Sequence, residues 1–174
     1  MMASYADDAT NEGDLMRLHY PIARDALLRS HPWNFAIKRA ELASSVTTPE
    51  FEYDYQFALP SDCLKVLRTE LESDNIEDNY RVEGRYLMSN DDAVSIEYIA
   101  KITDTNQFDS LFVDILAQKI AAEAAMPLIN DARVAQAASG SFESKLREAR
   151  SIDAQEGTPR QIIQSYDWLN ARGG

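Results

Sequence analysis

Pairs of carboxylates are the groups in this sequence whose type and spacing could do chemistry. Such pairs occur four times, at Asp7-Asp8, Glu70 and Glu72, Glu77-Asp78, and Asp91-Asp92. A glycoside hydrolase uses two carboxylates about 5 to 9 Å apart. The chain has 29 acidic residues, however, so pairs also arise on a solvated acidic face. A cell-wall glycosidase stays open as an alternative, and a glutamate with a raised pKa, in a cleft opposite a second carboxylate, would distinguish it.

Other reactive side chains are few. The single cysteine, Cys63, excludes an internal disulfide and a cysteine-rich zinc site. Asp62 beside it would raise the pKa of the thiol, so we interpret Cys63 as buried and structural. The two histidines, His19 and His31, have no nucleophile paired with them in the sequence, and we interpret both as structural. We therefore expect no catalytic residue, no cofactor and no metal.

Composition places these residues on one globular domain. The chain has 174 residues, of which 45% are hydrophobic, so it is long enough to bury a core. Its net charge of −12 argues against a general nucleic-acid-binding surface, which needs clustered Lys and Arg. No apolar run approaches the roughly 20 residues of a membrane span. The first residues do not resemble a signal peptide, so we expect a reducing cytoplasm or a particle assembled there.

The acidic excess is concentrated in the middle third of the chain. Residues 46–104 hold fourteen acidic and five basic residues, a net charge of −9. Residues 1–45 and 105–174 contribute only −1 and −2. The middle third also differs in hydrophobic period, which predicts a structural unit of its own.

The periodicity predicts helices on both sides of this unit. Apolar residues at steps of three to five predict an N-terminal helix over residues 14–31, kinked or interrupted at Pro21. A similar pattern predicts a C-terminal helical hairpin over 107–155. The first helix of that hairpin should end at Pro127.

Residues 33 to 104, between these helices, predict a β-rich insertion. Trp33 to Leu42 suits either a strand or a helix. Phe51, Tyr53, Tyr55 and Phe57 alternate with polar residues, which predicts a strand with an aromatic face for the core or a subunit interface. Further strands are predicted over residues 64–71, 80–83, 86–88 and 94–99. The residues themselves thus indicate an α+β class.

The last segment, residues 158–174, follows the helix breaker Gly157-Thr158-Pro159. It carries five large apolar or aromatic residues, which are Ile162, Ile163, Tyr166, Trp168 and Leu169. Trp and Tyr are favoured interface anchors. Either this tail folds back on its own core or it docks on a partner, and the sequence leaves both open.

Four groups of residues, in this order, resemble one family. They are 23–29 with 31–36 and 38–43; Tyr55 with 59–67; 80–85 with 96–99; and 108–112 leading into the Ala-rich helix to Ala125. Over about residues 20–155 the chain is similar to the tubular-protein-A, or head-to-tail adaptor, proteins of tailed bacteriophages. The tail is not covered by this resemblance.

The resemblance implies an antiparallel helical bundle with a small antiparallel β-sheet inserted between the N-terminal and C-terminal helices. It favours a strand for Trp33 to Leu42. It also implies a non-enzymatic virion protein at the head–tail interface, assembled in the host cytoplasm. Such proteins form a ring, typically of twelve copies, beneath the portal. The ring extends the DNA channel, and the tail or nozzle protein docks on it.

In such a ring, the acidic residues acquire a physical meaning. An acidic channel repels DNA phosphates at short range, with ions screening beyond about 8 Å, so DNA passes without specific binding. We expect acids of the middle third to lie along the channel or the tail-facing rim, namely Glu70, Glu72, Asp74, Glu77, Asp78, Asp91 and Asp92. The tail, through Tyr166, Trp168 and Leu169, would order on the portal or a neighbouring subunit. A standalone regulatory or chaperone-like binding domain is a third alternative.

Overall fold

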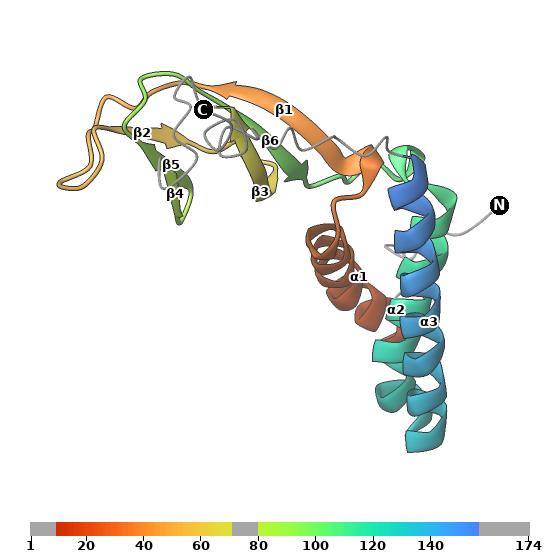
Figure 1. Cartoon of the computed structure of the whole chain (residues 1–174). Coiled ribbons are helices and arrows are strands. Elements are labelled where there is room, and N and C mark those ends of the chain that lie inside the picture. Colours follow the sequence, from red (N-terminus) through yellow and green to blue (C-terminus); the bar gives the residue numbers. More distant parts are fainter. Residues whose placement is uncertain (1–9, 71–79, 157–174) are drawn as a thin grey trace, which may run out of the picture.

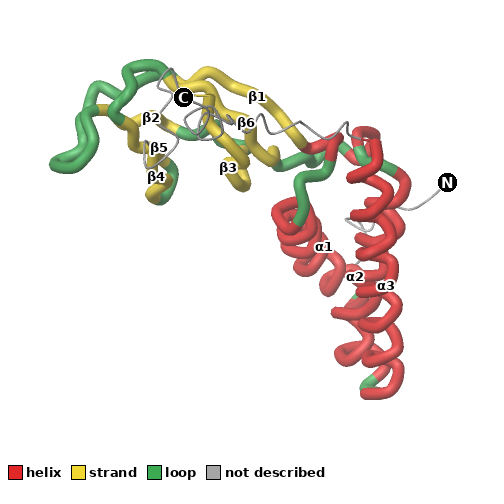
Figure 2. The backbone as a smooth tube through the Cα atoms, in the orientation of Figure 1, coloured by secondary structure: helices red, strands yellow, loops and turns green. Residues whose placement is uncertain are grey.

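The structure is a computed structural model that describes residues 10–70 and 80–156. These residues form three α-helices and two small antiparallel sheets, a mixed helix–sheet protein as predicted. The helices form a leg, and the strands form an arm that projects sideways from one end of it (Figure 1). Figure 2 shows how completely helix and strand are separated between the two parts. We call them the helical leg and the β arm.

Helix α1 (Asn11–Ser30) begins three residues earlier than the predicted Asp14. Thr10 is the N-cap, and its hydroxyl accepts a hydrogen bond from the Gly13 N–H at 3.2 Å. A threonine oxygen satisfies one of the backbone donors that a helix start leaves unpaired. The helix ends immediately before His31, as the following proline predicts.

Two prolines lie inside helices, where the sequence predicts a kink or an interruption at Pro21 and a helix end at Pro127. Pro21 lies within α1, and Pro127 lies within α2 (Ser110–Ile129), which therefore passes its predicted end. An interior proline removes one hydrogen bond and costs about 3 kcal/mol. Buried apolar residues after Pro21 hold α1 together. In α2 the proline is close to the end, where Asn130 adopts a left-handed conformation and donates its N–H to the Met126 carbonyl.

Helix α3 (Ala132–Glu156) lies beside α2 (Figure 1). Lys145 forms an ion pair with Asp114 at 3.2 Å, and the Ser141 hydroxyl contacts the Gln118 amide oxygen at 3.3 Å. Later residues of α3 thus contact earlier residues of α2, so the two helices run antiparallel. None of the helices in the described ranges has the length and apolar character that crossing a bilayer requires.

The β arm contains two three-stranded antiparallel sheets. The first has the order β1 (Ile37–Leu42), β6 (Val94–Ala100), β3 (Cys63–Glu70), and the second has the order β2 (Tyr55–Ala58), β5 (Tyr86–Ser89), β4 (Tyr80–Glu83). The predicted hairpin of β4 and β5 is present, and Gly84 in its turn has a φ of +59°, which glycine adopts readily.

The ambiguous segment from Trp33 to Leu42 divides between two structures. A short 3₁₀ helix (Asn34–Ala36) comes first, and strand β1 follows. In the register with β6, Ile37 lies opposite Ile99 beside the leg, and Leu42 lies opposite Val94. Strand β1 therefore leads the chain out along the arm, away from the helices.

The predicted aromatic strand over residues 51–57 is wrong in its first half. Strand β2 begins only at Tyr55, and Phe51 lies in the preceding loop with 78% of its surface exposed. Glu52 next to it has a φ of +74°, a left-handed conformation that interrupts an extended chain. Phe57 is fully buried, so the alternating residues do not share one face of a strand.

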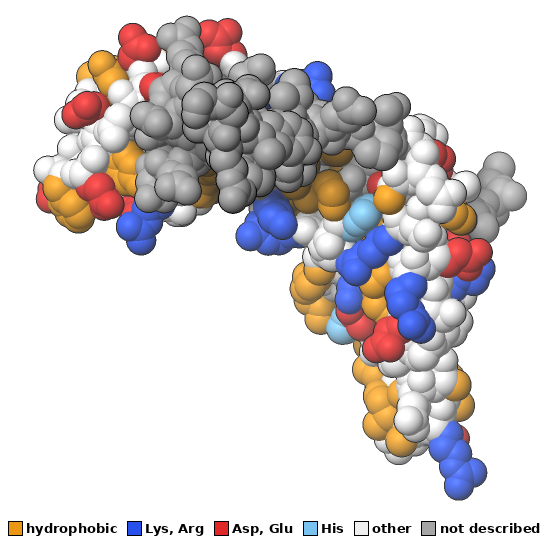
Figure 3. All heavy atoms as spheres, viewed as in Figure 1, with side chains coloured by type: hydrophobic (Ala, Val, Ile, Leu, Met, Phe, Trp, Pro, Cys, Tyr) orange, Lys and Arg blue, Asp and Glu red, His pale blue; other side chains and the backbone are white. Residues whose placement is uncertain are grey.

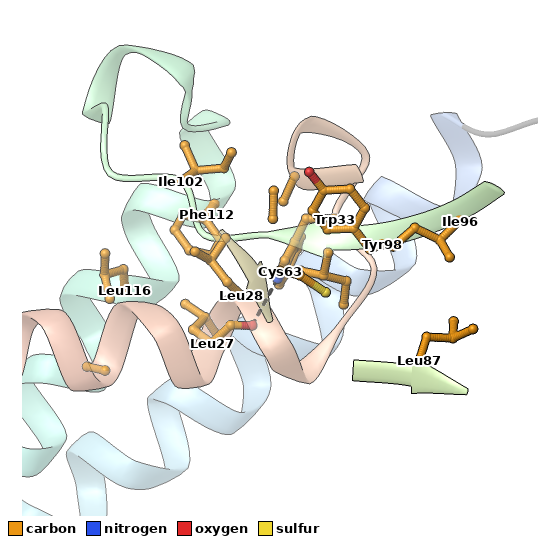
Figure 4. Packing of buried hydrophobic residues seen from close by; sticks show 14 of the residues in the cluster. Leu27, Leu28, Trp33, Cys63, Leu87, Ile96, Tyr98, Ile102, Phe112 and Leu116 are labelled. Atoms are coloured by element: carbon orange, nitrogen blue, oxygen red, sulfur yellow. Dashed lines mark hydrogen bonds between the residues drawn. The ribbon is translucent and has the colours of Figure 1, made fainter. Parts of the chain in front are cut away.

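The core continues from the leg into the arm around Trp33, which is 1% exposed (Figure 4). Its indole N–H donates to the Leu27 carbonyl at 3.0 Å. Its ring meets Phe112 edge-on, with the centroids 5.5 Å apart. Aromatic pairs of this geometry stabilise beyond the area they bury. Trp33 thus joins the end of α1, the start of β1 and the first turns of α2.

Candidate interaction surface on the β arm

The predicted acidic residues are only partly within the described structure. Asp91 and Asp92 lie in the turn between β5 and β6, with Asp91 half-buried and Asp92 exposed. Glu70 ends β3 and pairs through its backbone with Ser95, near the same turn. The structure therefore brings these three positions to the outer end of the arm. Glu72, Asp74, Glu77 and Asp78 lie outside the described residues.

Acidic side chains gather over this outer end in the space-filling view (Figure 3). The turn is tied down locally, because the Asn90 side-chain oxygen accepts the Asp54 N–H at 3.0 Å. One carboxylate oxygen of Asp91 is buried without a hydrogen-bond partner among the described residues.

The predicted tail residues Ile162, Ile163, Tyr166, Trp168 and Leu169 lie outside the described residues.

Glu97 is the centre of a charge network on one face of the first sheet. It lies on the central strand β6, directly opposite Arg39 of β1 and Arg68 of β3. Its carboxylate accepts hydrogen bonds from Arg39 Nε at 3.0 Å and from Arg68 Nη2 at 2.8 Å. The Glu97 side chain is 17% exposed, whereas that of Arg39 is 78% exposed. Charge-assisted hydrogen bonds of this kind are the strong ones, so Glu97 links all three strands.

Replacing Glu97 with glutamine should flatten the acid side of the pH–stability profile. The hydrogen bond from Arg68 lowers the pKa of Glu97 from its usual 4.5, against the opposing effect of burial. A lowered pKa in the folded state stabilises the fold above about pH 4.5, and this stabilisation is lost as the pH falls through the folded-state value. The free energy of unfolding, measured in urea from about pH 5 to 3, should therefore fall less in E97Q than in the wild-type chain.

The matched control for this prediction is Glu41→Gln, because Glu41 is exposed on the neighbouring strand β1. That variant should keep the wild-type slope. Equal slopes in E97Q and the wild-type chain would contradict the stabilising role of the network.

Two adjoining hollows open on this face, and Glu97 lines both. The inner hollow, of about 370 Å³, is lined by His31, Pro32, Asn34, Ile37, Leu67, Glu97, Asp153 and Ala154. The outer hollow, of about 270 Å³, is lined by Arg39, Ala40, Glu41, Arg68, Ser95, Ile96 and Glu97. Their lining residues follow β1 from Ile37 to Glu41, starting beside the last turn of α3, and we call the two hollows together the groove.

A clamp between α3 and the start of the arm builds the inner end of the groove. The Asp153 carboxylate lies 3.0 Å from His31 Nε2 and accepts the Asn34 N–H at 3.1 Å. The side-chain amide of Asn34 donates through Nδ2 to the backbone carbonyl of Asp153 at 2.7 Å. Leu67 enters from the other side, as the extra residue of a β-bulge between Val66 and Arg68. A bulge re-aims a side chain in this way.

The two carboxylates of the inner hollow, Glu97 and Asp153, bear on the glycosidase alternative. An acid catalyst needs a raised pKa so that it holds a proton. The hydrogen bond from Arg68 lowers the pKa of Glu97 instead. Glu97 therefore lacks the property that would distinguish a glycosidase.

Cys63 is buried, as expected. Burial is the largest cause of a raised pKa of its thiol. His19 is partly exposed, with Nδ1 3.5 Å from a Glu123 carboxylate oxygen, and His31 belongs to the clamp described above. The predicted structural role of His31 is consistent with its hydrogen bond to Asp153.

The helical leg exposes large apolar side chains along its length. On α1 these are Leu18 and Ile22, four residues apart and about 60% exposed. On α2 and α3 they are Val113, Met126, Leu128, Ile129, Val134 and Ile152. Because they are four residues apart, Leu18 and Ile22 lie on the same face of α1 and give it an exposed apolar face.

The sequence did not indicate Arg39, Arg68 and Glu97 as a site. The alternation of 94–99 could have placed Glu97 on a polar face, but its partners depend on the pairing of distant strands. No protein-family model matches this chain, and no curated protein is significantly similar to it.

Proposed function

We propose that this chain is a structural subunit of a phage head-to-tail adaptor, which forms a ring of about twelve copies beneath the portal. In this proposal the helical leg is an antiparallel bundle, with the β arm inserted between its N-terminal and C-terminal helices. The ring extends the DNA channel, and the tail or nozzle protein docks on it. DNA passes through without specific binding.

The observation that carries the proposal is the division of one subunit into two surfaces. Helices α1 to α3 hold nine acidic and eight basic residues, so the leg is nearly neutral. It also exposes the apolar side chains described above. Residues 37–100 hold fourteen acidic and six basic residues, so the arm is strongly acidic. Because the legs are nearly neutral, neighbouring legs can bury apolar surface against one another without repulsion between like charges. The acidic arms stay in water.

The acidic residues then have two places in such a ring. Asp91, Asp92 and the end of β3 at Glu70 would lie along the channel or on the tail-facing rim, and the other predicted acids, within residues 71–79, are close to Glu70 in sequence. Like charges on twelve arms repel, which favours a wide, hydrated opening rather than a closed one. A ring structure with the outer end of the arms on the outer wall would contradict the channel version.

Stoichiometry tests the proposal. The mass of the purified protein is measured by native mass spectrometry alone, and then after mixing with the portal protein of the same genome. We expect a monomer that joins the portal as a ring of about twelve copies. A protein that stays monomeric and unbound would contradict the adaptor, and peptidoglycan hydrolysis would then be the next assay.

A further inference from the structure

The groove formed by the inner and outer hollows fits an extended peptide segment. Its inner hollow offers apolar surface from Ile37 and Leu67. Its outer hollow offers two arginines, with Glu41 and Glu97 between and beside them. Peptide-binding grooves gain specificity by presenting pockets of different character in a fixed order along a sheet.

We infer that residues 157–174 of the same chain occupy this groove. The groove begins where this segment leaves the described structure, because Ala154 lines the inner hollow and α3 ends two residues later at Glu156. A segment tethered this closely has an effective concentration in the millimolar range at the groove. A modest contact is then enough to hold it there.

The order of side chains in the segment matches the order of the hollows. Ile162 and Ile163 come first and suit the apolar surface that Ile37 and Leu67 offer in the inner hollow. Tyr166-Asp167-Trp168 follow, and they suit the arginines of the outer hollow, through an ion pair with Asp167 and cation–π contacts to the rings.

The spacing matches as well. The outer hollow extends from Arg39 to Glu41, two to four residues from Ile37 on β1, or about 7 to 13 Å. Ile163 and Asp167 are four residues apart, so an extended tail with Ile163 over Ile37 brings Asp167 to the outer hollow. The long side chain of Arg39, and not the carboxylate of Glu41, is the partner of Asp167 there.

Fluorescence of Trp168 in the full chain tests this inference. Trp33 is buried, so acrylamide quenching reports mainly on Trp168, and the Trp168→Phe variant gives the residual signal. With a contact of about 0.1 mM and a millimolar effective concentration, the segment is docked about 90% of the time, so quenching of Trp168 should be about tenfold weaker than for a free tryptophan. Quenching equal to that of a free tryptophan would overturn the inference.

A groove-filling variant identifies the place of docking. Ala154→Arg puts a long side chain at the mouth of the inner hollow, on an exposed helix position that tolerates arginine. In this variant the segment should no longer dock, so acrylamide should quench Trp168 about tenfold more strongly than in the wild-type chain, as expected from 90% docking. Ala137→Arg is the matched control, because Ala137 is exposed on the same helix but does not line either hollow, and it should change nothing. If acrylamide quenched Trp168 as weakly in Ala154→Arg as in the wild-type chain, the inference would be overturned.

Dilution separates the chain's own segment from that of a second copy. Docking within one chain is independent of concentration, so protection of Trp168 should persist from micromolar to nanomolar protein. Protection that disappears on dilution would assign the groove to a neighbouring copy and overturn the inference. The measurement needs no portal protein, so its result is independent of the proposed adaptor function.

Discussion

Trp33→Ala should lower the free energy of unfolding by about 3–5 kcal/mol, the range for removing a fully buried aromatic ring. The side chain is almost completely buried, and it contacts Phe112 edge-on. Its removal also leaves the Leu27 carbonyl without the indole N–H that it accepts at 3.0 Å. A single domain has a free energy of unfolding of about 5 to 15 kcal/mol in total, so the midpoint of urea unfolding should fall to a much lower urea concentration. Urea unfolding followed by circular dichroism measures the change.

Two further variants separate the causes of this loss. Trp33→Phe keeps an aromatic ring but not the hydrogen bond to Leu27, so it should cost less than the alanine variant. Phe51→Ala removes an aromatic ring that is 78% exposed, so it should change stability by no more than about 0.5 kcal/mol. A similar cost for Trp33→Ala and Phe51→Ala would contradict the core position of Trp33.

The order of helices and strands could be predicted because it depends on local hydrophobic period. The alternation in 94–99 and the turn at Gly84 were sufficient to place β6 and the β4–β5 hairpin. The errors occur where tertiary structure outweighs local preference. Helix α2 continues past Pro127, its predicted end, to Ile129, and residues 51–54 do not form a strand despite their alternation, because no strand among the described residues pairs with them.

The groove could not be predicted, because its parts come from distant segments. Arg39 and Arg68 meet Glu97 only through the register of three strands, and Asp153 reaches Asn34 across 119 residues of sequence. Leu67 enters the inner hollow only because a β-bulge adds one residue to β3. Each feature follows from long-range pairing, which periodicity does not specify.

Deleting residues 159–174 should abolish attachment to the portal while leaving the described fold intact. This prediction rests on the proposed adaptor function. Trp and Tyr are typical interface hot spots, each worth about 2 kcal/mol or more. Removal of Tyr166 and Trp168 together should therefore cost about 4 kcal/mol, or about a thousandfold in affinity. Co-sedimentation with portal rings measures attachment, and circular dichroism measures the fold.

Point variants show whether the loss comes from these aromatic residues or from the length of the tail. Trp168→Ala should weaken attachment by about thirtyfold, from the same hot-spot energy. Arg172→Ala, in the same segment, is the matched control and should attach as the wild-type chain does.

If the inference about the groove also holds, the tail must leave its own groove to reach the portal, because the same aromatic residues serve both contacts. Ala154→Arg, which fills the groove, should then attach more tightly than the wild-type chain. Undiminished attachment of the deletion variant would show instead that the leg or the arm makes the portal contact.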